Sequence, residues 1–118
     1  WLAAKSSDYR ALDKLPPANV TATATLSGRA NGEDHITVQL TNSGSSVALE
    51  NKLTLLKAGD GARILPAYYS DNYVSLLPGE TREVEVSYPA SATQGSRPEF
   101  TLRGWNLASR TVGVSGGN

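Results

Sequence analysis

Two glutamates, Glu83 and Glu85, form the residue pair in this 118-residue sequence that most suggests catalysis. They stand two residues apart in a segment that alternates like a β-strand, so their side chains share one face, roughly 6.5–7 Å apart by the strand rise. Inverting glycosidases use two carboxyl groups about 6.5–9.5 Å apart as their general acid and general base. Catalytic pairs, however, flank a substrate cleft and have unlike environments that separate their pKa values. Two glutamates side by side on an outward face share one environment, so we expect them to be solvated.

Other catalytic or metal-binding constellations have little support. The sequence has a single histidine, His35, and no cysteine, which excludes sites that need two imidazoles or a thiolate. No serine lies in a G-x-S-x-G turn. Asp60, Asp71 and Asn72 could offer oxygen atoms to calcium, but their spacing matches no calcium-binding loop. We expect no cofactor and no metal, and we expect Asp71 and Asn72 to form Asx turns with nearby backbone amides.

The aromatic residues offer a different chemistry, because flat apolar rings with polar tips suit carbohydrates. The candidate contact residues, for a sugar or for a neighbouring domain, are Tyr68, Tyr69, Asp71, Asn72, Tyr73 and Trp105. Tyr68 and Tyr69 are adjacent, so in an extended segment they point to opposite faces and only one can join any single platform. The alternative, which we favour, is that these rings pack within the fold or between domains.

Charge and composition narrow the class of partner. Eleven Lys and Arg residues balance eleven Asp and Glu residues, with no block of like charge. A nucleic-acid groove or an anionic membrane would require a basic excess, and no apolar run approaches the roughly 18–20 residues of a membrane-spanning helix. We therefore expect neither as a partner. Because the sequence lacks methionine and begins at Trp1, we also expect it to be cut from a longer protein.

The elements that must position these residues are short strands. Alternating apolar and polar residues predict strands over 20–27, 36–41, 47–57 and 81–88, with shorter extended pieces at 64–68, around 100–102 and at 111–114. Leu56 breaks its alternation, which suggests a bulge or burial on both faces, and Pro66 fits best on an edge strand. Turns are predicted at 31–34, 42–45 and 59–61, and the Pro78-Gly79 pair suits a type II turn.

About seven strands, with turn signals every roughly 8–12 residues and no amphipathic helix, are typical of an immunoglobulin-like or fibronectin III-like antiparallel β-sandwich. We expect this all-β domain to span residues 19–114. Residues 1–18 would be a connector from a preceding domain, with one helical turn over 7–15 ended by Pro16-Pro17. Residues 115–118 would be a flexible tail.

The most distinctive stretch, LPAYYSDNYVSLLPGE at residues 65–80, resembles a segment of the Ig-like domains near the C-terminus of glycoside hydrolase family 2 enzymes. These are the exo-β-D-glucosaminidases and their β-mannosidase relatives, in which the segment has the form P-x-x-(aromatic)-S-D-N-Y-x-x-L-L-P-G-E. Further residues similar to the family pattern are Trp1-Leu2 followed by Asp8, the Leu15-Pro16 step, and Gly104-Trp105-Asn106.

The resemblance implies a non-catalytic accessory domain that packs against other domains of the same polypeptide, with Trp1, Tyr9 and Tyr69 or Tyr73 in the partner surface. In such enzymes the catalytic glutamates lie in a separate (β/α)8 barrel, which 118 residues cannot contain. The resemblance also favours a parent enzyme that is bacterial and either secreted or periplasmic. Two alternatives stay open: a carbohydrate-binding module that contacts chitosan- or mannan-type polysaccharide chains, and a stand-alone adhesion-type sandwich.

Overall fold

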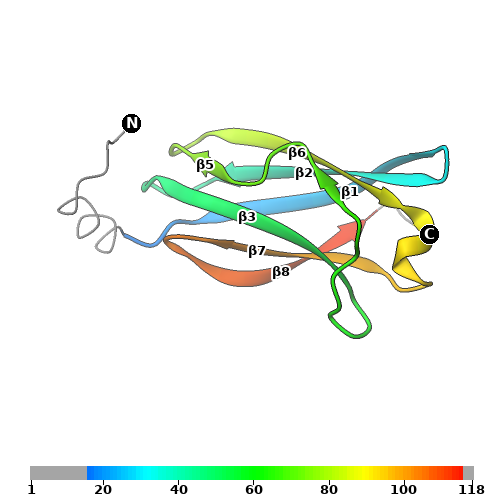
Figure 1. Ribbon diagram of the computed structural model, residues 1–118. Coiled ribbons are helices and arrows are strands. Elements are labelled where there is room, and N and C mark those ends of the chain that lie inside the picture. Colours follow the sequence, from blue (N-terminus) through cyan, green and yellow to red (C-terminus); the bar gives the residue numbers. More distant parts are fainter. Residues whose placement is uncertain (1–15, 116–118) are drawn as a thin grey trace.

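The structure is a computed structural model that describes residues 16–115 of the chain. Eight strands form one curled sheet in the order β4-β6-β2-β1-β8-β7-β3-β5 (Figure 1). The strands are β1 (Val20–Ala30), β2 (Glu33–Asn42), β3 (Ala48–Lys57), β4 (Tyr68–Tyr69), β5 (Val74–Leu76), β6 (Thr81–Pro89), β7 (Pro98–Gly104) and β8 (Leu107–Ser115), and the short 3₁₀ helix η1 spans Ala90–Thr93. None of the described residues belongs to a helix of the length and apolarity that crossing a membrane requires.

The curled sheet folds into two layers, β4-β6-β2-β1 and β8-β7-β3-β5. They join where β1 and β8 run parallel, with Ala24 beside Val114 and Thr25 beside Ser115. Apolar side chains from both layers fill the space between them; they include Val20, Ile36, Val38, Leu40, Leu55, Ile64, Val84, Val86, Tyr88, Phe100 and Leu102. Full burial of such a side chain contributes about 1.5–3 kcal/mol. The predicted antiparallel Ig-like sandwich is therefore confirmed.

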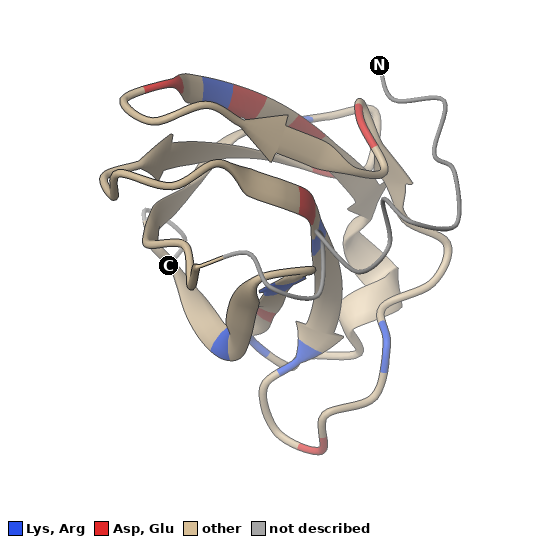
Figure 2. Ribbon diagram, turned by 90° about the vertical axis from the view of Figure 1, so that its left-hand side faces the viewer, with Lys and Arg blue, Asp and Glu red and all other residues tan. Residues whose placement is uncertain are grey.

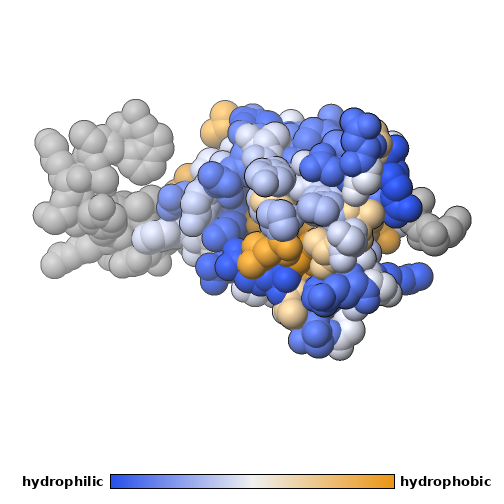
Figure 3. Space-filling view, turned by 45° about the vertical axis from the view of Figure 1, so that its right-hand side comes forward, coloured by the Kyte–Doolittle hydropathy of each residue, from blue (hydrophilic) through white to orange (hydrophobic). Residues whose placement is uncertain are grey.

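The period-2 pattern explains why the strands bury one face. In β6, Val84, Val86 and Tyr88 are buried while Glu83 and Glu85 are exposed, as predicted. The outer surface is accordingly hydrophilic over most of the side seen in Figure 3, where the largest hydrophobic area lies near the middle of the view and smaller ones lie towards its edges.

Two turns have the backbone geometry that their residues favour. Asn31 and Gly32 join β1 to β2 with φ values of 53° and 79°, the pair of left-handed conformations of a type I′ hairpin. Because these two residues suffice, Glu33 already pairs with Ala30, and the prediction that Glu33 and Asp34 belong to the turn is wrong. Gly79 has a φ of 81°, and the Glu80 amide donates to the Leu77 carbonyl at 2.9 Å, which confirms the type II turn.

Other details of the strands differ from the prediction. The irregularity in β3 lies at Glu50 (φ 49°), between Ala48 and Asn51, and not at Leu56, which pairs regularly with Glu99. The last strand is longer than 111–114, because pairing with β7 holds it from Leu107 onwards. The predicted helical turn over 7–15, Trp1 and Tyr9, and all but the first residue of the predicted tail lie outside the described residues.

The family-like stretch passes from one layer to the other. Leu65 and Pro66 form a cis peptide bond before β4, so Pro66 precedes the edge strand rather than lying in it. The strand β4 pairs with β6, Tyr68 opposite Ser87, whereas β5 pairs with β3, Val74 opposite Asn51. The chain therefore changes layers between Tyr69 and Val74, and candidate site residues on either side of this step are separated.

Candidate functional site

Tyr68 lies on the outer face of the β4-β6-β2-β1 layer, and its side chain is 61% exposed. It stands opposite Ser87, which in turn pairs with His35. These residues, with Ser70 and Glu85, line a shallow hollow of about 280 Å³. An aromatic face beside an imidazole, hydroxyl groups and a carboxylate is a combination that can contact a sugar ring.

Tyr69 points the opposite way, as its neighbour's outward position requires. Its ring is half-buried and packs against the core, and its hydroxyl oxygen accepts a hydrogen bond from the Leu55 amide at 2.9 Å. Because β3 lies in the other layer, this hydrogen bond links the two layers. Tyr69 therefore has a structural role, because its hydroxyl holds β4 against β3.

The polar corner after Tyr69 is closed by Ser70. The Ser70 amide donates to the Glu85 carbonyl at 2.8 Å, and the Glu85 amide donates to the Ser70 hydroxyl oxygen at 2.9 Å. The Asp71 carboxylate accepts from the Ser70 hydroxyl at 3.4 Å. Within residues 16–115, neither Asp71 nor Asn72 forms the predicted Asx turn. Such turns occur instead at Asn42, which accepts from the Gly44 amide, and at Asp60, which accepts from the Ala62 amide.

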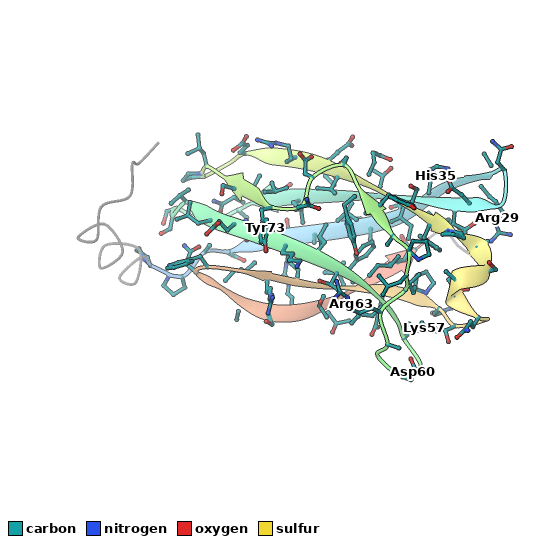
Figure 4. All side chains as sticks on the ribbon, viewed as in Figure 1. Arg29, His35, Lys57, Asp60, Arg63 and Tyr73 are labelled. Carbon is teal, nitrogen blue, oxygen red and sulfur yellow. The ribbon has the colours of Figure 1, made fainter. Side chains whose placement is uncertain are left out.

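Tyr73 belongs to the other layer. The residue is 58% exposed, and the Lys52 ammonium lies 5.6 Å from the ring centroid, a cation–π arrangement. Lys52 faces Arg103 on the next strand, so this row across the outer face is basic. Figure 4 shows Tyr73 beside β3, well away from His35, which lies towards the β1–β2 hairpin.

Trp105 occupies the turn between β7 and β8. Its backbone amide donates to the Leu49 carbonyl at 2.9 Å, and its side chain is 45% exposed. The six candidate residues therefore lie in different places: Tyr68 on one outer face, Tyr69 inside, the Asp71-Asn72 corner between the layers, Tyr73 on the other outer face and Trp105 at one end. The structure does not bring these aromatic rings together into one stacking platform.

A charged cluster at the hairpin end of the domain, in which Asp34 is buried and Arg29 is exposed, was not predicted from the sequence. Asp34 is 6% exposed and receives two hydrogen bonds from the Arg29 guanidinium, one of them between Nη2 and Oδ2 at 3.1 Å. The guanidinium's pKa is raised by this hydrogen bonding and charge. Beside the pair, burial first and the Asp34 carboxylate second raise the pKa of Tyr88 to about 12.

Three asparagines were also missed, and each joins segments that are distant in the sequence. Asn42 donates to the Ser46 and Leu76 carbonyls, Asn51 to those of Ala48 and Val74, and Asn106 to those of Pro16 and Val47. A signal for two of these existed, because Asn42 continues the inward series of Ile36, Val38 and Leu40, and Asn51 that of Leu53 and Leu55. Asp34 is in phase with the same β2 series. Polar residues at inward positions predict buried, hydrogen-bonded groups.

Glu83 and Glu85 lie on the outer face, as expected. The Glu85 carboxylate accepts from the Thr37 hydroxyl, with oxygen separations of 3.0 and 3.2 Å. Among residues 16–115, no group of three or more His, Asp or Glu side chains is arranged to hold a metal ion.

A protein-family model, that of the exo-beta-D-glucosaminidase Ig-fold domain, matches residues 1–107 of the chain. The chain belongs to this family. Over 108 residues, this Ig-fold domain is 34% identical to an exo-beta-D-glucosaminidase of Streptomyces avermitilis, and the match covers 90% of the chain but 12% of the relative. It is also 46% identical over 52 residues to a mannosylglycoprotein endo-beta-mannosidase of Lilium longiflorum, a match that covers 44% of the chain and 5% of that protein.

The fold agrees with that of a solved relative. The crystal structure of the Amycolatopsis orientalis exo-chitosanase CsxA superposes with a TM-score of 0.81 at 33% sequence identity, over 86% of this chain and 12% of that one. This Ig-fold domain therefore spans a small fraction of the proteins that it matches.

Proposed function

We propose that this Ig-fold domain is a non-catalytic accessory part of a larger β-glycosidase of the exo-β-D-glucosaminidase or β-mannosidase type. It supports the architecture of that enzyme and packs against its other domains. Residues 1–18 act as the connector, 19–114 as the domain and 115–118 as a tail. The names of the relatives and the small share of their length that the chain spans support this proposal.

The observation that carries the proposal is that the polar groups of residues 65–80, the stretch that resembles the family, form hydrogen bonds within the fold. These residues carry the chain from one layer to the other, and their hydrogen bonds fix its path. Their hydrogen bonds join Tyr69 to Leu55, Ser70 to Glu85, Leu77 to the Glu80 carboxylate at 2.8 Å, and Asn42 to both Gly79 and Glu80 at 2.8 and 2.9 Å. A motif whose polar groups are engaged in this way serves the fold.

The glutamate pair is not placed for acid–base chemistry. Glu83 and Glu85 are both exposed on an open sheet face, where nothing gives them the unlike surroundings that separate an acid from a base. The proposal therefore assigns catalysis to another part of the polypeptide.

Neighbouring tyrosines provide a matched test in the full-length parent enzyme. Tyr69→Phe removes the acceptor of the Leu55 amide and leaves a buried donor unpaired, which costs about 1–3 kcal/mol. Tyr68→Phe removes only an exposed hydroxyl. We expect Tyr69→Phe to lower the melting temperature while kcat, measured well below it, stays at the wild-type value for both variants. A fall in kcat without a change in melting temperature would contradict an accessory role.

A second candidate function is weak contact with a polysaccharide of amino sugars or mannose. The hollow beside Tyr68 supports it, because a sugar ring can stack on the exposed ring while the Glu85 carboxylate attracts an ammonium group. The test is an NMR titration of the 118-residue chain with glucosamine and mannose oligomers. Shifts at His35, Tyr68 and Ser87 that vanish in Tyr68→Ala but persist in Tyr73→Ala would support contact. Absence of shifts at millimolar sugar would remove this candidate.

A further inference from the structure

A hollow of about 410 Å³ lies at the end of the domain where β1 turns into β2, beside the segment that follows η1. One side of it is the charged cluster described above, Arg29 and Asp34 with Tyr88, and another side is formed by residues 93–98. Figure 4 shows Arg29 at this end of the domain, near the β1–β2 hairpin. Sites for small organic ligands usually enclose about 300–1,000 Å³. The hollow therefore has the dimensions of a small-molecule site.

Arg29 meets this hollow with hydrogen-bond donors that its own ion pair does not use. The Asp34 carboxylate accepts from Nε and from Nη2 of Arg29, so it holds the guanidinium along one side. A guanidinium has more N–H donors than these two bonds use, and both donors on Nη1 remain. The Arg29 side chain is 65% exposed, whereas that of Asp34 is 8% exposed. The buried carboxylate thus fixes a guanidinium whose outer edge is open to a second carboxylate.

The charges that line the hollow favour an anion. Among residues 16–115, Asp34 is the one acidic residue in the lining, and it is paired with Arg29; Arg97, which is exposed, adds a second positive charge. Figure 2 shows Lys and Arg mainly in the lower part of the view, and Asp and Glu mainly in the upper part. Arg97 belongs to the more basic part, because it directly precedes β7. Positive potential of this kind attracts an anionic ligand.

Apolar side chains complete the lining. Leu26 comes from β1, Pro98 from β7 and Val114 from β8, and Leu26 and Val114 also pack against the core. An inorganic anion would leave these apolar surfaces in contact with water, whereas an organic carboxylate covers them with its carbon body. Ligand sites commonly combine apolar walls with a few polar groups. The lining therefore suits an anion that carries a compact apolar body.

Hydrogen bonds hold the walls of the hollow in place. The Ala90 amide donates to the Gly32 carbonyl at 2.8 Å, which joins the start of η1 to the β1–β2 hairpin. The Ala58 amide donates to the Arg97 carbonyl at 2.8 Å, which joins the segment after η1 to the end of β3. A preformed site of this kind loses little affinity to the ordering of loops.

We propose that this hollow is a binding site for a small organic carboxylate. The carboxylate is bound by the free edge of the Arg29 guanidinium and by Arg97. The apolar body lies against Leu26, Pro98 and Val114. The inference goes beyond the accessory function, and the two are independent, because a domain that takes no part in catalysis can still bind a ligand.

Benzoate and benzamide are matched probes, because they share a ring and differ in charge. In an NMR titration of the 118-residue chain, benzoate should shift the amide signals of Gly95 and Ser96 and the Arg29 Nε–H signal, with saturation in the millimolar range. Benzamide should shift none of them. Equal shifts with both probes, or none with benzoate, would overturn the proposal. Inorganic phosphate should act more weakly than benzoate; an equal effect would indicate an adventitious ion only and would overturn the organic ligand.

Three variants separate the hollow from the general charge of the domain. Arg97→Gln should weaken benzoate binding several-fold, while Arg103→Gln, which removes the same charge from the outer face of β7, should leave it unchanged. Arg29→Lys keeps a cation beside Asp34 but loses the planar fork, so it should also weaken binding several-fold. Equal losses in Arg97→Gln and Arg103→Gln would mean that benzoate follows the charge of the whole face, and would overturn a site in this hollow.

Discussion

The side-chain oxygen of Asn51 lies directly against Gly104: a β-carbon added at Gly104 would sit 2.4 Å from Asn51 Oδ1. Asn51 is 1% exposed, and its Nδ2 donates to the Ala48 and Val74 carbonyls at 3.2 and 2.9 Å. The same side chain therefore follows the β3 irregularity, joins β3 to β5 and presses against β7. Gly104 is required by this close approach, because any larger residue would collide with Asn51.

Gly104→Ala should destabilise the domain by about 1–3 kcal/mol, the usual cost of adding carbon to closely packed space. The control is Gly113→Ala on β8, where an added β-carbon meets nothing within 4 Å. Denaturant unfolding of both variants measures the difference. Equal stability of the two would show that Asn51 moves aside freely.

Gly79 tests backbone conformation without a steric contribution, because its φ is 81° and an added β-carbon has open space. Gly79→Ala should cost about 1–2 kcal/mol, the penalty of a left-handed conformation for a residue with a β-carbon. Gly79→Asn should cost less, since asparagine tolerates this region better. Equal melting temperatures for Gly79→Ala and the wild type would contradict the type II turn.

Glu80 should make stability depend on acid pH. Its carboxylate accepts from the Leu77 amide and, less strongly, from Arg82, so its pKa is lowered from the ordinary 4.5. A lowered folded-state pKa contributes stability above the unfolded-state value, and this is lost as pH falls through the folded-state value. The advantage of wild type over Glu80→Gln should therefore be full at pH 7 and shrink below about pH 4.5. A constant difference across this range in urea titrations would contradict it.

Tyr88 should make the stability of the domain depend on pH in the alkaline range. Its pKa is raised from 10.0 to about 12, so the folded state keeps the phenol protonated. The stability that the protonated Tyr88 phenol contributes is fully present below pH 10 and is lost as the pH rises from 10 to about 12. The unfolding free energy of wild type should thus fall more steeply than that of Tyr88→Phe between these values. Parallel curves would mean that the phenol titrates normally in the folded state.

Much of the fold could be predicted from the sequence because alternation is a local signal. Val84, Val86 and Tyr88 predicted their strand and its inward face, and Pro78-Gly79 predicted its turn. The Asn31-Gly32 pair also carried a local signal for a two-residue hairpin turn, and placing Glu33 and Asp34 in that turn overlooked it. The last strand extends back to Leu107 because β7 supplies partners, and residues 107–110 carry no alternation of their own.

The candidate site was harder to predict, because its residues depend on the change of layer within residues 65–80. Tyr68 and Tyr73 are five positions apart in the sequence, yet β4 pairs with β6 and β5 with β3, so their rings occupy different faces. That Tyr69 would point away from Tyr68 followed from strand geometry alone. The buried roles of Asp34, Asn42 and Asn51 were visible as polar residues in phase with apolar neighbours, although their partners come from distant strands.

The central claim, that this domain takes no part in the chemistry of its parent, is tested most directly by removing both outward glutamates. In the full-length enzyme, Glu83→Gln with Glu85→Gln should leave kcat/KM for the glycoside that the wild type hydrolyses at the wild-type value. A general acid or base typically contributes about 10²–10⁴-fold. A loss of that size, in a protein with the wild-type melting temperature, would contradict the account.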